Sequence, residues 1–90
     1  MYKTGRAYSI ADLAELARST MEQKNITQQQ AAEELSRQFE AKRGSRFQQP
    51  QVSAALSDPE KNPGMVMLLV EAFTDYRVSE AAKYTLEKKP

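Results

Sequence analysis

Apolar residues recur three or four residues apart along the first part of this 90-residue chain. Ser9 precedes the first such stripe. Asp12 stands three residues after Ser9, as in an N-terminal capping box with Asp in place of the usual Glu. The apolar positions are Ile10, Leu13, Leu16, Ala17 and Met21. The pattern predicts a first helix over residues 9–24, and Asn25 is a plausible stop.

The same start signal returns at Thr27, with Gln30 at the third helical position. Ala31, Leu35 and Phe39 then form a stripe at intervals of four. We expect a second helix over residues 27–43, ended by a left-handed residue at Gly44.

Two prolines mark the starts of the next helices, because a missing N–H costs nothing in the first turn of a helix. Pro50 opens a short helix over residues 50–57, with Val52, Ala55 and Leu56 on its inward side. Asn62-Pro63 opens a helix over residues 63–74, which contains the run "MVMLLV" and is expected to be the buried centre.

The end of the chain is interpreted as a fifth helix over residues 79–88. Ser79 is a candidate cap, Ala82 and Leu86 supply the apolar positions, and lysines stand at the C-terminal end, where the macrodipole favours them. No alternating segment of convincing length predicts a strand. We therefore expect an all-α, five-helix single domain over residues 1–90, with residues 1–8 as a flexible arm.

The composition argues against several functions. The chain has no Cys and no His, which removes thiolate metal sites, the commonest transition-metal ligand and the commonest general base. We expect no enzyme activity, no metal and no cofactor. The longest apolar run is too short to span a bilayer, and "MYKTGRAY" lacks the apolar stretch of a signal peptide, so we expect a cytoplasmic protein without a membrane partner.

Charge and amides gather before and within the predicted third helix. Residues 41–57 include Lys42, Arg43 and Arg46 but no acidic residue, although the net charge of the chain is only +1. These cations suit either a phosphate backbone or a solvated loop. Three glutamines, Gln48, Gln49 and Gln51, follow at the helix start. A glutamine amide can pair with N6 and N7 of adenine in the major groove, whereas a buried core would leave it unsatisfied.

Four segments carry a resemblance to the helix-turn-helix domains of the phage lambda repressor and Cro class, also called the XRE family. "ITQQQAAEEL" (26–35) resembles the second helix and "QQPQVSAALSD" (48–58) the recognition helix of these domains. "NPGMVMLLVEAF" (62–73) resembles the fourth helix, and "RVSEAA" (77–82) the start of the fifth. This chain has additional residues near "SRQFEAKRGS" (36–45), which we interpret as an extended second helix and turn.

The resemblance implies a lambda-repressor-like fold and a DNA-binding transcriptional regulator of bacterial or phage type. Its third helix would enter the major groove of double-stranded DNA. The expected base-contacting residues are Gln49, Pro50, Gln51 and Ala54. The expected phosphate-contacting residues are Gln28, Arg43, Arg46, Gln48, Ser53 and Ser57. The resemblance also implies that Gln28 braces the recognition helix.

The same scaffold is compatible with a protein–protein interaction module that does not bind DNA, since a fold alone does not decide a function. A homodimer is expected on functional grounds, because one short helix covers few base pairs. The candidate dimer surface is the last predicted helix, with Tyr76, Tyr84 and Leu86.

Overall fold

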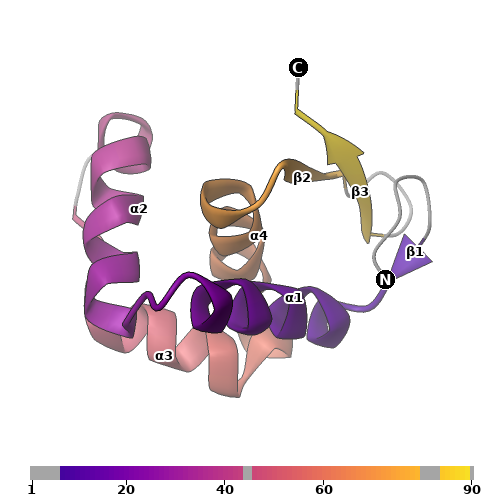
Figure 1. Cartoon of the computed structure of the whole chain (residues 1–90), viewed down its shortest axis with the longest axis horizontal. Helices are drawn as coiled ribbons and strands as arrows, with labels where there is room; N and C mark the ends of the chain where they lie inside the picture. Colours follow the sequence, from indigo (N-terminus) through magenta and orange to yellow (C-terminus); the bar gives the residue numbers. More distant parts are fainter. Residues whose placement is uncertain (1–6, 44–45, 80–83, 90) are drawn as a thin grey trace.

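The computed structural model describes residues 7–43, 46–79 and 84–89, with side chains for all of these except residues 40–43 and 79. Within these ranges it contains four α-helices, one 3-10 helix and a small three-stranded antiparallel sheet. The prediction of an all-α, five-helix domain is therefore wrong. The fold is mixed, with helices in the centre of the chain and strands near both ends (Figure 1).

The four helices are α1 (Ile10–Gln23), α2 (Gln28–Arg43), α3 (Gln49–Ser57) and α4 (Pro63–Phe73), with the 3-10 helix η1 (Pro59–Lys61) between the last two. Each of the four α-helices begins and ends within one residue of the helix expected there from the sequence. Both capping boxes are present. The Ser9 hydroxyl accepts from the Asp12 N–H at 3.1 Å, and the Thr27 hydroxyl accepts from the Gln30 N–H at 3.1 Å.

The turn between α1 and α2 is set by Asn25, whose φ of 55° lies in the left-handed region. The Ile26 N–H donates to the Met21 carbonyl at 2.9 Å, and the Asn25 N–H donates to the Glu22 carbonyl at 3.2 Å. These two bonds form a Schellman motif, which satisfies carbonyls at the end of α1. The motif ends α1 sharply and fixes where α2 begins.

The sheet consists of β1 (Ala7–Tyr8), β2 (Tyr76–Ser79) and β3 (Tyr84–Lys88), in the order β1-β3-β2. In the β2–β3 pair Val78 lies opposite Leu86, and Arg77 lies opposite Glu87 with a 3.2 Å ion pair. Val78 and Leu86 face the core, whereas Arg77 and Glu87 are exposed, as expected for opposite faces of a sheet. The predicted helix over residues 79–88 is wrong, because residues 84–88 form a strand.

The N-terminal arm and the dimer surface also need correction. Ala7 and Tyr8 of the expected arm pair with Thr85 and Tyr84 of β3, whereas residues 1–6 lie outside the described part of the chain. Leu86 is fully buried, and Tyr76 and Tyr84 are partly buried against the same core. Leu86 is therefore part of the core of the monomer, and residues 84–88 of the expected last helix form β3 instead, whereas the homodimer itself stays a prediction.

The core lies where α1, α2 and α3 meet α4, and β2 extends it by packing against α4. In Figure 1, α2 stands at one end of α1 and the sheet lies at the other. The fully buried large apolar side chains are Leu13, Leu35, Val52, Val66, Leu69, Val70 and Leu86. No helix within the described residues is long and apolar enough to cross a lipid bilayer.

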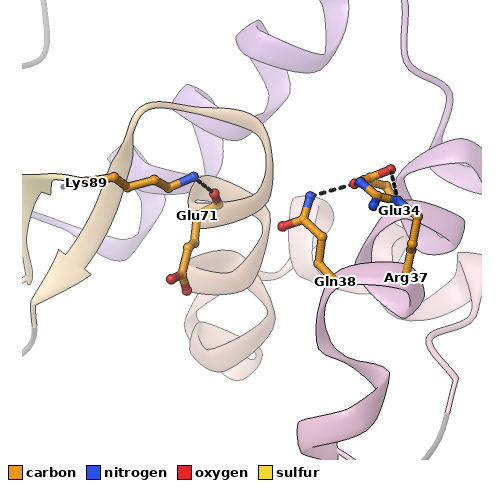
Figure 2. A network of polar contacts seen from close by, with 5 residues as sticks. All are labelled: Glu34, Arg37, Gln38, Glu71 and Lys89. Atoms are coloured by element: carbon orange, nitrogen blue, oxygen red, sulfur yellow. Dashed lines mark hydrogen bonds and ion pairs between the residues drawn. The ribbon is translucent and has the colours of Figure 1, made fainter.

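Lysines close the C-terminal end of α4. The Lys24 ammonium donates to the Phe73 carbonyl at 2.8 Å, and the Lys89 ammonium donates to the Thr74 carbonyl at 2.8 Å and also to the Glu71 carbonyl (Figure 2). Cations at this end satisfy carbonyls without helical partners and complement the macrodipole. They tie the end of α1 and the residue after β3 to α4.

Candidate nucleic-acid interface

The lengthened connection between α2 and α3 is tied back to α2 by a buried serine. The Ser36 hydroxyl accepts from the Phe47 N–H at 2.8 Å and donates to the Ala32 carbonyl at 3.0 Å. Ser36 and Phe47 are both buried, as is Phe39 on the added length of α2. The chain therefore enters α3 from a fixed point. The helix stop expected at Gly44 lies outside the described residues.

The start of α3 is capped by its own glutamines. Gln48 is the N-cap, and its N–H donates to the Gln51 side-chain oxygen at 2.7 Å. The Gln51 N–H donates in turn to the Gln48 carbonyl at 3.0 Å. Pro50 lies in this first turn, where it removes no helical hydrogen bond. The capping role of Gln51 was missed in the sequence, although a glutamine three residues after the cap is the signal that identified Thr27 and Gln30.

A second amide contact joins the starts of α2 and α3. The Gln49 side-chain nitrogen donates to the Gln28 side-chain oxygen at 2.6 Å, between residues 21 apart in the sequence. Both side chains are half-buried, so the bond is partly protected from water. This is the brace expected for Gln28. It holds the N-terminal turn of α3 against α2 and leaves amide groups of both residues for other partners.

The outer side of α3 is a stripe of small side chains. Pro50 and Ser57 are exposed, and Ser53 and Ala54 between them are half-buried. The Ser57 hydroxyl donates to the Ser53 carbonyl at 2.8 Å, which leaves its oxygen as an outward acceptor. The inward residues expected from the sequence, Val52, Ala55 and Leu56, are all buried. A stripe without bulky side chains lets the α3 backbone approach another surface closely.

The C-terminal end of α3 is fastened by two side chains that sequence reasoning did not single out for this role. The Arg18 guanidinium of α1 donates to the Leu56 carbonyl at 2.8 Å. The Asn62 amide donates to the Ala54 carbonyl at 3.3 Å and to the Asp58 carbonyl at 2.9 Å. The Leu56 carbonyl lies in the last turn of α3, where carbonyls lack helical partners, whereas the Ala54 carbonyl also accepts from the Asp58 N–H at 2.8 Å. Together with Gln28, these contacts fix both ends of α3 on the domain.

Positive charge is concentrated on the segment that leads into α3. Arg46 is exposed just before the N-cap, and Arg43 is the last residue of α2, although its side chain is not among those described. Gln48 is exposed beside Arg46. The α3 sequence itself contains no Lys or Arg. The expected contact residues whose side chains are described therefore lie on α3 or next to it, with Gln28 beside the start of α3.

Two hollows lie near α2. One, of about 250 Å³, lies beside Gln28 and is lined by residues of α1, α2 and α3 that include Arg18 and Leu56. The other, of about 390 Å³, lies between the α1–α2 turn and the end of α4 and is lined by Glu34 and Phe73 among others. No α3 residue lines the larger hollow, so it is separate from the candidate interface.

A charged network covers the outer part of α2. The Glu34 carboxylate accepts from the Arg37 guanidinium and from the Gln38 amide at 2.6 Å (Figure 2). These hydrogen bonds hold the pKa of Glu34 below its ordinary value, and the bond from Arg37 has the largest effect.

No protein-family model, no curated protein and no solved structure matches this chain.

Proposed function

We propose that this protein binds double-stranded DNA in a sequence-dependent manner, with α3 in the major groove, and acts as a transcriptional regulator. The observation that carries the proposal is the 2.6 Å bond between Gln28 and Gln49. It presents the starts of two helices together, with Arg46 and Gln48 exposed beside them. The resemblance of these segments to the lambda repressor and Cro class supports the same role.

The chemistry of the α3 face suits a groove. Amides read base edges, small side chains permit close approach, and Pro50 and Ala54 offer apolar contact to thymine methyl groups. Phosphate contacts would come from the periphery, at Gln28, Arg43, Arg46, Gln48, Ser53 and Ser57. Such contacts set the position of a protein on the duplex, whereas base contacts set its sequence preference.

A salt titration tests the proposal directly. We expect the logarithm of affinity for mixed-sequence duplexes to fall linearly with the logarithm of salt concentration, with a slope of about −0.9 per phosphate neutralised. Arg46→Ala should weaken binding to all sequences alike and make the slope shallower by about one such unit. Fluorescence anisotropy with labelled duplexes measures both quantities.

The matched control is Arg77→Ala, which removes the same charge from the sheet, where Arg77 pairs with Glu87. It should leave the slope unchanged, because β2 lies away from α3 (Figure 1). Equal losses from the two variants would contradict the proposed face. Absence of salt-dependent binding in the unaltered protein would contradict DNA binding altogether.

One observation favours a second candidate, a protein–protein interaction module. The α3 sequence has no cation and the net charge of the chain is only +1, which gives little long-range attraction for DNA. A protein partner would use the same exposed helix face without needing positive charge. The salt titration distinguishes the two candidates, since only DNA binding predicts release of counterions from a duplex.

A further inference from the structure

The larger hollow, of about 390 Å³, plays no part in the proposed DNA-binding face. Three elements surround it, namely the turn after α1, the start of α2 and the C-terminal end of α4. Its volume lies in the lower part of the range of about 300–1,000 Å³ that small-molecule sites occupy. The hollow therefore has room for a small organic ligand.

The lining of the hollow is part apolar and part polar. Ile26 and Ala72 are half-buried apolar residues of the lining, and the buried Phe73 stands beside Ala72. Lys24, Gln30 and Glu34 supply polar groups. Small-molecule sites combine apolar surface with a few polar groups that fix the orientation of the ligand. A ligand that matches this lining has an apolar body and a polar end.

The two charged groups of the lining differ in whether their charge is already compensated. The Glu34 carboxylate forms an ion pair with the Arg37 guanidinium and also accepts from the Gln38 amide (Figure 2). The Lys24 ammonium donates to the Phe73 carbonyl at 2.8 Å and forms no ion pair within the described residues. An ammonium has three donors, so two of them remain. The charge left to attract a ligand is therefore positive.

Gln30 adds neutral donors to the same lining. Its side-chain oxygen accepts from the Thr27 N–H at 2.9 Å, and its nitrogen donates to no group among the described residues. Hydrogen bonds from a cationic donor to a carboxylate are among the strongest in proteins. We propose that this hollow binds a small organic carboxylate, whose oxygens accept from Lys24 and Gln30. The apolar body of the ligand packs against the apolar part of the lining.

This inference does not rest on DNA binding, because no α3 residue lines the hollow. A titration with sodium hexanoate at neutral pH, followed by ¹H–¹⁵N correlation spectra of the whole chain, tests it without DNA. We expect saturable shifts of the backbone amide signals of Asn25, Ile26, Ala72 and Phe73. Saturation shows a defined site, and the positions of the shifted signals show where the site lies.

Probes that differ in one end or in length identify the class of ligand. Hexanamide and hexylammonium carry a neutral and a positive end, and each should bind at least about tenfold more weakly than hexanoate, since neither offers a charged acceptor to the ammonium. Butyrate should also bind about tenfold more weakly, because each of the two missing methylenes contributes a factor of about three when it is buried.

Lys24→Met removes the charge and keeps much of the length of the side chain. It should weaken hexanoate binding at least about tenfold. Lys89→Met is the matched control, because Lys89 also donates to a carbonyl at the C-terminal end of α4 but does not line the hollow. It should leave hexanoate binding unchanged. Circular dichroism checks that both variants are folded, and if Lys24→Met is not, the comparison of hexanoate with hexanamide decides.

Three results would overturn the proposal. Shifts that do not saturate, or that centre on residues away from the hollow, exclude the site. Hexanamide or hexylammonium binding as tightly as hexanoate excludes a carboxylate as the preferred ligand. Equal losses in folded Lys24→Met and Lys89→Met exclude a direct bond from Lys24. The salt titration with duplexes is a separate measurement, so failure of the carboxylate site leaves the proposed DNA binding standing, and the reverse also holds.

Discussion

The region around α3 and the small sheet are held to the domain by different forces. Around α3 the fixing contacts are polar and specific, such as Ser36 with Phe47 and Arg18 with the Leu56 carbonyl. The sheet depends mainly on strand pairing and on one fully buried side chain, Leu86, with Lys89 after β3 as its polar tie to α4. Hydrogen bonds fix direction, whereas apolar burial is nearly non-directional. We infer that the polar contacts fix the orientation of α3 and that the sheet mainly adds buried area.

The largest expected effect is on the sheet. Leu86→Ala should lower the free energy of unfolding by about 2–5 kcal/mol, because it removes a fully buried side chain and leaves a cavity. Urea unfolding followed by circular dichroism measures the loss. Leu68→Ala, at a half-buried position on α4, should cost less. A loss at Leu86 no larger than at Leu68 would mean that the sheet contributes little to the core.

Next in size is the polar tie at the entrance to α3. Ser36→Ala should cost about 1–3 kcal/mol, because the buried Phe47 N–H loses its acceptor. Ser57→Ala is a matched control, since Ser57 makes the same bond to a carbonyl four residues earlier but is exposed. The comparison is again made by urea unfolding. Similar costs at the two serines would show that the bond to Phe47 adds nothing.

A smaller change is expected at the turn before α2. Asn25→Ala should destabilise the protein by about 1 kcal/mol, because alanine tolerates the left-handed backbone less well than asparagine. Asn25→Gly should be neutral or stabilising, since glycine has no penalty there. Thermal unfolding of both variants separates backbone strain from loss of the side chain. Equal destabilisation by alanine and glycine would assign the effect to the asparagine side chain.

The smallest effect is expected for Glu34→Gln on α2. The pKa of Glu34 is lower in the folded than in the unfolded state, so its contribution to stability is present above the unfolded pKa and is lost as pH falls through the folded pKa. The difference in stability between the two proteins should therefore be small at neutral pH and should disappear in acid. Urea unfolding across acidic to neutral pH tests this. A difference that grows on acidification would contradict it.

The helices were predictable because their signals are local. Ser9 with Asp12, Thr27 with Gln30, and the prolines at 50 and 63 each mark a start within one turn, and the apolar stripes supply the period. The local signals near the end of the chain were misleading for residues 84–88, since Ser79 suits a helix cap and Leu86 stands four residues after Ala82, yet residues 84–88 form a strand. Strand formation near the end of the chain depends on pairs of residues from different strands, such as Val78 of β2 with Leu86 of β3.

The candidate interface was predictable in part. The third helix and its inward residues followed from the pattern, and a contact of Gln28 with the recognition helix was expected from the resemblance, although its partner Gln49 was not. The bond from Arg18 to Leu56 joins residues 38 positions apart, and nothing local in the sequence indicates it.

The pairing of β1 with β3 has a consequence for synthesis of the protein on the ribosome. Ala7 pairs with Thr85, so β1 has no partner until residue 85 has been made. All four helices precede β3, and contacts between distant residues form more slowly than local ones. The packed helices therefore have to stay together until β3 is available to pair with β1. Docking of β3, with Leu86 beneath it, closes the molecule in a late step.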